Sequence, residues 1–207
     1  MEMNKNLETR QNKTECRAIE TDGKRSIEGY ALLYDHESRQ IYERGQLFTE
    51  VIKRGALDEI MTPELDVIYT PNHDFSKVIA RTTSGTLKLV SDERGLKYVV
   101  EDIPNISYAN DIFESIKRGD TFESSFTFAL NNEDQNWSEK EDGETLRTIS
   151  KISYLKEVSS VTDGAYSNTD VAVRSLNEFL KVNEKDESYL IDLELKEKEL
   201  EILKIKK

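Results

Sequence analysis

Short runs of β-branched and aromatic residues, separated by turn sequences, recur along most of this chain and restrict it to a mainly β fold. Residues 14–20 and 26–34 flank Asp22-Gly23, a dipeptide that is typical of tight hairpin turns. Residues 86–102 indicate a second hairpin around the sequence DERG at 92–95. Similar runs occupy residues 64–70, 121–130, 145–162 and 171–175. We therefore expect an α+β, mainly β fold with a β-barrel-like core and a few surrounding helices.

The clearest helical pattern of this β-rich part covers residues 107–118. Ser107 is a candidate N-cap, and Gly119 is a typical C-terminal stop. Apolar residues at 112, 113 and 116 fall on one face of the predicted helix. A short strand is expected in the segment 47–61, followed by a break at Gly55 and a second, short helix.

Composition changes at both ends of the chain. Residues 1–13 are polar and unpatterned, which predicts a flexible N-terminal arm. Residues 176–207 are rich in helix formers and contain no Gly or Pro, and Glu194 and Lys198 form a favourable i,i+4 pair. We expect one domain over residues 14–175 and a charged helical tail over 176–207.

The chain is acidic, with a formal net charge of −12. This charge argues against nucleic acid as the main partner, because phosphate binding depends on clustered Lys and Arg. No apolar run approaches the ~20 residues of a membrane span, and the N-terminus has no apolar stretch typical of a signal peptide. We therefore expect no membrane association and a cytosolic location.

Metal and cofactor chemistry finds little support in the sequence. The single cysteine, Cys16, excludes an intrachain disulfide and a cysteine-rich zinc site, and we expect it to pack as a small apolar residue. The two histidines, His36 and His73, have no metal-ligand spacing. Walker A, Rossmann and calcium-loop patterns are absent from the sequence. We expect no metal and no cofactor.

The segment TFESSFTFAL, residues 121–130, carries two adjacent serines in a predicted strand. Ser124 shares its parity with three phenylalanines at 122, 126 and 128, whereas Ser125 points to the opposite face. One interpretation is a hydroxyl that faces solvent on a half-buried strand. The other is a nucleophile, which needs a base within hydrogen-bond reach and a group that orients the base. His73, in a loop after a strand, is the better candidate base, and His36 is the weaker one.

Four segments in a fixed order resemble the prohead (capsid maturation) serine proteases of tailed bacteriophages, which are similar in fold to herpesvirus assembly proteases. The segments cover residues 48–59, 72–96, 111–128 and 155–175, so the resemblance extends over nearly the whole predicted domain. It implies a serine endopeptidase whose catalytic histidine is His73, in the sequence NHD. It also implies that the nucleophile is Ser125 of the sequence SFTF, rather than Ser124.

The resemblance implies Glu157, in the sequence LKEVS, as the third catalytic residue. Asp74, Asp163 and His36 remain alternatives for that role. Two positions depart from the family pattern: Thr127 replaces a common Gly between the phenylalanines, and Gly164 replaces a common Pro. Thr127 leaves the substrate preference open, because it lies two residues after the candidate nucleophile.

The same resemblance implies a biological setting. Such proteases lie inside the immature capsid in the host bacterial cytoplasm, where they cleave the scaffold or the scaffolding arm of the major capsid protein, and commonly themselves. A homo-oligomer inside the prohead is a further expectation. The tail 176–207 is expected to bind scaffold or to be removed by self-cleavage. The alternatives are a catalytically silent scaffolding protein with the protease fold, and an esterase or amidase on an unrelated β fold.

Overall fold

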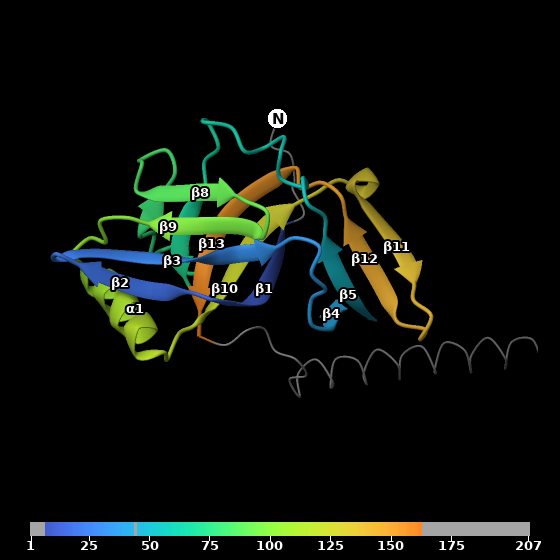
Figure 1. The fold of residues 1–207 in the computed structure, drawn as a ribbon, viewed down its shortest axis with the longest axis horizontal. Coiled ribbons are helices and arrows are strands. Elements are labelled where there is room, and N and C mark those ends of the chain that lie inside the picture. The colour runs from blue at the N-terminus through green and yellow to red at the C-terminus, as the bar shows by residue number, and fades with distance from the viewer. Residues whose placement is uncertain (1–6, 44, 163–207) are drawn as a thin grey trace, which may run out of the picture. The chain divides into compact units, whose positions relative to one another are not determined.

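Three β-sheets contain 48% of the residues in the computed structural model, which describes residues 7–43 and 45–162 (Figure 1). One sheet has the strand order β1 (Glu8–Glu15), β10 (Glu123–Ala129), β13 (Tyr154–Val161), β6 (Ile68–Pro71) and β7 (Ala80–Arg81). The second has the order β11 (Gln135–Glu139), β12 (Thr145–Ile149), β5 (Gln46–Ile52) and β4 (Ile41–Glu43). The third has the order β2 (Arg17–Thr21), β3 (Lys24–Leu33), β9 (Gly95–Val100) and β8 (Leu87–Ser91). The predicted mainly β class is confirmed, but the sheets do not close into a barrel.

Strand β10 lies between β1 and β13 in the five-stranded sheet and is antiparallel to both (Figure 1). Strand β13 continues into a parallel pairing with β6, in which Glu157 is opposite Ile68. Every residue of β10 is buried, so neither face of this strand is open to solvent. The solvent-facing interpretation of the two serines is therefore wrong.

Local turn chemistry accounts for the two predicted hairpins. Asp22 and Gly23 both have positive φ angles, 51° and 76°, as a two-residue turn with left-handed residues requires. The β8–β9 hairpin forms around the predicted turn. Gly95 is required there for space, because a Cβ atom at this position would lie 2.0 Å from the carbonyl oxygen of Leu32. Both hairpin predictions are confirmed.

One core contains residues from most of the described strands and from α1 (Ser107–Arg118), the single α-helix among the described residues. The helix ends at Gly119, which has a φ of 83° and donates its N–H to the carbonyls of Ile116 and Ser115. The predicted apolar face, Ile112, Phe113 and Ile116, is buried. The N-cap is Ile106 rather than Ser107, and it makes no side-chain cap, so that prediction was wrong by one residue.

Replacing Phe113 with Ala is expected to lower the free energy of unfolding by about 3–5 kcal/mol, because the ring is fully buried and its loss leaves a cavity. Urea denaturation monitored by circular dichroism measures this change. The neighbouring Glu114→Ala is the matched control; its side chain is exposed, and a change within about 0.5 kcal/mol is expected. Equal losses in the two variants would contradict the assignment of this helix face to the core.

Several segment predictions need correction. Residues 8–13, assigned to a flexible arm, belong to β1, because main-chain pairing with β10 orders a polar segment that has no apolar alternation. The segment after Gly55 forms turns instead of a short helix. The acidic connection before β12 contains a 3-10 turn, Asn132–Asp134, and strand β11. The tail 176–207 lies outside the described residues.

Cys16 packs in the core, as predicted, and its Sγ donates a hydrogen bond to the carbonyl of Glu123 at 3.7 Å. Burial raises the pKa of the thiol to about 12, so only roughly 10⁻⁴ of it is ionised at pH 8. Iodoacetamide at pH 8 is therefore expected to leave the folded protein unmodified, and to alkylate it completely in concentrated urea. Mass spectrometry measures the alkylation over time. Rapid alkylation of the folded protein would contradict the buried position of Cys16.

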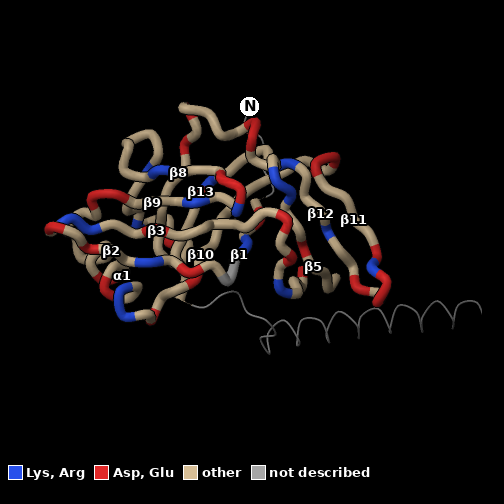
Figure 2. Tube along the Cα trace, viewed as in Figure 1, with Lys and Arg blue, Asp and Glu red and all other residues tan. Residues whose placement is uncertain are grey.

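Charged residues of both signs are interspersed along the described strands (Figure 2). Within residues 7–43 and 45–162, no helix has the length and apolar character needed to cross a membrane. The same residues contain no group of three or more side chains that could bind a metal ion together.

Candidate active site

The two adjacent serines of β10 have different surroundings. The hydroxyl of Ser124 is buried and shares a hydrogen bond with the hydroxyl of Tyr98 at 2.9 Å. Phe126 and Phe128, which have the same parity, are buried in the core, whereas Phe122 precedes the strand and is exposed. The side chain of Ser125 points the other way, toward His73. Ser124 is therefore part of the core, and Ser125 belongs to a polar site.

His73 lies in the turn that follows β6, and its backbone conformation is unusual. Asn72 and His73 have φ angles of 48° and 59°, a region that costs non-glycine residues free energy. Strand β13 and the residue after it hold this turn in place. The N–H of Asn72 donates to the Ser160 carbonyl at 2.9 Å, the N–H of His73 donates to Ser159 Oγ at 3.2 Å, and Asn72 Oδ1 accepts the N–H of Thr162. These bonds fix the direction of the imidazole.

The imidazole of His73 links Ser125 to Glu157. Its Nε2 lies 2.7 Å from Ser125 Oγ, and its Nδ1 lies 3.0 Å from Glu157 Oε2. A carboxylate only accepts hydrogen bonds when it is ionised, so Nδ1 carries a proton in this arrangement. When Nδ1 holds the only ring proton, Nε2 has a lone pair that can accept the serine proton.

Two threonines orient the carboxylate of Glu157, which has an exposed fraction of 0%. The hydroxyl of Thr70 donates to Oε1 through a short hydrogen bond, and the hydroxyl of Thr127 donates to Oε2 at 3.1 Å. A buried carboxylate needs such donors, because it has lost its contact with water. Thr127 therefore contacts the acidic member of the site.

The remaining predicted candidates do not join this group. Asp74 is bonded to its own loop, where hydrogen bonds from Ser76 and Lys77 lower the pKa of its carboxyl to about 2. His36 is exposed in the loop after β3, and no hydrogen bond connects it to Ser125 or His73. Asp163 lies outside the described residues.

Sequence reasoning missed the hydroxyls that support the site. Ser159 accepts the His73 N–H and donates to the Thr70 carbonyl at 2.6 Å. Thr70 and Thr127 reach Glu157 from β6 and β10, one on each side of β13. The register of the strands determines the positions of these hydroxyls. In the sequence, the one indication of them is the alternation of polar residues around Ser125 and Glu157.

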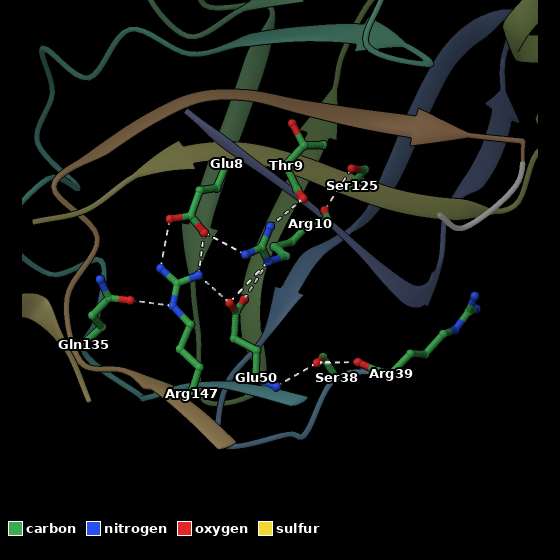
Figure 3. Close-up of polar contacts among 9 residues, drawn as sticks. All are labelled: Glu8, Thr9, Arg10, Ser38, Arg39, Glu50, Ser125, Gln135 and Arg147. Atoms are coloured by element: carbon green, nitrogen blue, oxygen red, sulfur yellow. Dashed lines mark hydrogen bonds and ion pairs between the residues drawn. The ribbon is translucent and has the colours of Figure 1, made fainter. Parts of the chain in front are cut away.

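A charged cluster lies next to Ser125 and includes the N-terminal strand (Figure 3). The Nε of Arg10 lies 3.2 Å from each carboxylate oxygen of Glu50, and Arg147 contacts both Glu50 and Glu8. Burial raises the pKa of the Glu50 carboxyl, while the two arginines oppose that shift. Burial also opposes ionisation of Arg147, but Glu8 and Glu50 raise its pKa above the usual value. The cluster joins β1 to β5 and β12.

The hydroxyl of Ser125 has a second neighbour on β1. Its Oγ donates to the main-chain carbonyl oxygen of Arg10 at 2.8 Å (Figure 3). With β1 paired to β10, Ser125 has an exposed fraction of 0%.

A serine bonded to a histidine that is in turn bonded to a buried carboxylate is the arrangement of the Ser-His-acid hydrolases. Comparison with protein families identifies the group within that class. The model of the caudovirus prohead serine protease family matches residues 12–182, most of the 207-residue chain, and the chain belongs to this family. Membership of this family indicates that the chain has a protease role in phage prohead maturation. Searches of curated proteins and of solved structures found no match.

Proposed function

We propose that this chain is a serine endopeptidase that acts inside the prohead, in the host bacterial cytoplasm. Its substrates are the scaffold or the scaffolding arms of the major capsid protein, and its own chain is a further substrate. The observation that carries the catalytic part is the position of the His73 ring, within hydrogen-bond distance of both Ser125 and Glu157. Family membership supports the capsid or scaffold as the substrate class.

Ser125 is the nucleophile in this proposal. Its Oγ attacks the carbonyl carbon of the scissile peptide while its proton moves to Nε2 of His73. The C–N bond then breaks, and Nε2–H gives the same proton to the leaving amine. An ester between Ser125 and the new C-terminal acyl group remains on the enzyme.

Deacylation repeats these steps with water. His73 Nε2 takes a proton from the water, whose oxygen attacks the ester carbonyl carbon. The bond between that carbon and Ser125 Oγ then breaks, and Nε2–H returns the proton to Oγ. Glu157 keeps its bond to Nδ1–H throughout, and stabilises the imidazolium that forms in each half of the reaction. The Thr70 and Thr127 bonds keep that carboxylate aimed at the ring.

The alternative of a catalytically silent scaffolding protein receives no support from a specific observation. Asn72 and His73 are consecutive residues with left-handed backbone conformations, which cost free energy and direct the imidazole of His73 toward Ser125. This cost would bring no benefit to a protein without catalytic activity. An esterase on an unrelated fold is disfavoured by membership of a protease family.

Co-expression with the capsid protein of the same phage, including its scaffolding arm, tests the proposal. Intact-mass spectrometry should find discrete fragments of the capsid protein or of the scaffold. Hydrolysis of small esters with no cleavage of either protein would instead support the esterase alternative. Intact proteins and no ester hydrolysis would support the silent alternative.

A further inference from the structure

Lys156 is a cationic side chain that lies beside the histidine and the carboxylate of the site. It directly precedes Glu157 on β13, and its Nζ lies 3.9 Å from the centroid of the Phe75 ring. Phe75 follows His73 by two residues in the same loop. The contact therefore joins the segment that carries the proposed base to the strand that carries its acidic partner.

A β-bulge gives Lys156 its position. In a regular strand, Leu155 and Glu157 would point to the same face of the sheet. The register between β13 and β10 shifts between these two residues, so Leu155 is buried in the core while Glu157 contacts His73. Lys156 is the extra residue, and such bulges redirect side chains next to functional sites. Its contact with Phe75 places the ammonium on the His73 side of the sheet.

Two cations of the neighbouring loop and strand already have carboxylate partners. Lys77 Nζ, in the loop after β6, lies 3.0 Å from Asp74 Oδ2. Arg81, on β7, donates two hydrogen bonds to Asp66, at 2.6 Å and 2.5 Å. Within residues 7–43 and 45–162, no carboxylate forms an ion pair with Lys156. Its cation–π contact leaves ammonium N–H groups able to donate to an incoming anion.

An incoming peptide can reach this pair of side chains. Phe75 has an exposed fraction of 46%, and Lys156 is partly exposed. A side chain with an apolar stem and a terminal carboxylate matches both surfaces, since the stem can pack on the ring and the carboxylate can accept from Nζ. The chain as a whole carries a net charge of −12, which repels acidic peptides. A local cation without a carboxylate partner among the described residues offsets this repulsion at one position.

We propose that Lys156, held by Phe75, is a specificity-determining residue that binds an aspartate or glutamate side chain of the substrate. The proposal rests on the proposed function, in which Ser125 cleaves a peptide. Because Lys156 has one fixed position relative to Ser125, the acidic residue occupies one fixed position relative to the cleaved bond. This contact exists both before and during the reaction, so its loss raises KM and leaves kcat close to the wild-type value.

Digestion of a synthetic decapeptide library with randomised sequences tests this preference. Mass spectrometry of the products gives the residues that are enriched at each position around the cleaved bond. The wild type should select Asp and Glu at one position, Lys156→Arg should retain that selection, and Lys156→Glu should select Lys and Arg there instead. Lys88→Glu is the matched control, because it changes the net charge equally at an exposed ion pair with Glu101 on another sheet. It should keep the wild-type preference.

A matched pair of peptides measures the size of the effect. One peptide carries Glu at the selected position, and the other carries Gln. In the wild type, kcat/KM should be roughly tenfold higher for the Glu peptide, because the Gln peptide lacks the charge-assisted hydrogen bond. Lys156→Gln should remove this difference with kcat unchanged, and Phe75→Leu should reduce it. A merely structural role of Lys156 would lower the activity toward both peptides equally, together with the temperature of unfolding.

The outcomes separate the subsite from the proposed function. Cleavage without selection of acidic residues, or the same selection in Lys156→Glu as in the wild type, would overturn the subsite while Ser125 keeps its assigned role. If the wild type cleaves only the capsid or scaffold protein, the cleaved sites should share an acidic residue at one position, and its absence would also overturn the subsite. Failure to cleave the library and these proteins alike, or cleavage that persists in Ser125→Ala, would contradict the proposed function and the subsite with it.

Discussion

Replacement of Ser125 with alanine is expected to abolish peptide hydrolysis, with a loss of about 10⁴–10⁶ in kcat. The variant loses the atom that forms the acyl-enzyme in the proposed mechanism, while the fold keeps all main-chain pairs of β10. Intact-mass spectrometry of the purified chain, alone and with the capsid or scaffold protein of the same phage, measures the result. The wild type should release defined fragments of the substrate over time, and Ser125→Ala should leave it whole.

Ser124→Ala is the matched control, one residue away on the same strand. It loses only the hydrogen bond to Tyr98, which contributes about 1 kcal/mol to stability, and it should keep its activity. Loss of activity in Ser124→Ala, with activity retained in Ser125→Ala, would show that Ser124 is the nucleophile and that the assignment to Ser125 is wrong.

Local chemistry explains which parts of the fold could be predicted from the sequence. The Asp22-Gly23 turn and the Gly119 helix end depend on backbone conformations that few residue types adopt, so they are visible in short segments. Residue chemistry and a family resemblance together indicate His73 and Ser125 as site residues. Their mutual contact arises from the parallel pairing of β6 with β13 and the antiparallel pairing of β13 with β10, which no local pattern indicates.

The N-terminal strand could not be predicted, because its order comes from residues far away in the sequence. The segment 8–15 is polar and lacks the alternation that marks a half-buried strand. Its partners are the β10 main chain and two charged residues, Glu50 and Arg147, from separate strands. The segment that composition described as a flexible arm is therefore a strand that pairs with Ser125.

Glu157→Gln is expected to lower kcat about 10⁴-fold, while KM stays close to that of the wild type. The amide has nearly the same shape as the carboxylate, but it can donate a hydrogen bond to Nδ1 of His73. That tautomer places the ring proton on Nε2, where it blocks acceptance of the Ser125 proton. Steady-state kinetics on a peptide taken from the cleaved segment separates the two constants.

Glu101→Gln is a suitable control for this substitution, because Glu101 is an exposed carboxylate that pairs with Lys88 at the surface. It should retain wild-type kcat and KM. In the proposed mechanism Glu157 acts on the reaction through His73, so loss of fold must be distinguished from loss of orientation. Thermal unfolding of Glu157→Gln should remain cooperative, because the amide oxygen can accept from Thr70 while the amide N–H groups donate to Nδ1 of His73 and to the hydroxyl oxygen of Thr127. A folded Glu157→Gln protein with kcat within tenfold of the wild type, beside an inactive His73→Ala, would limit Glu157 to packing between β6 and β10.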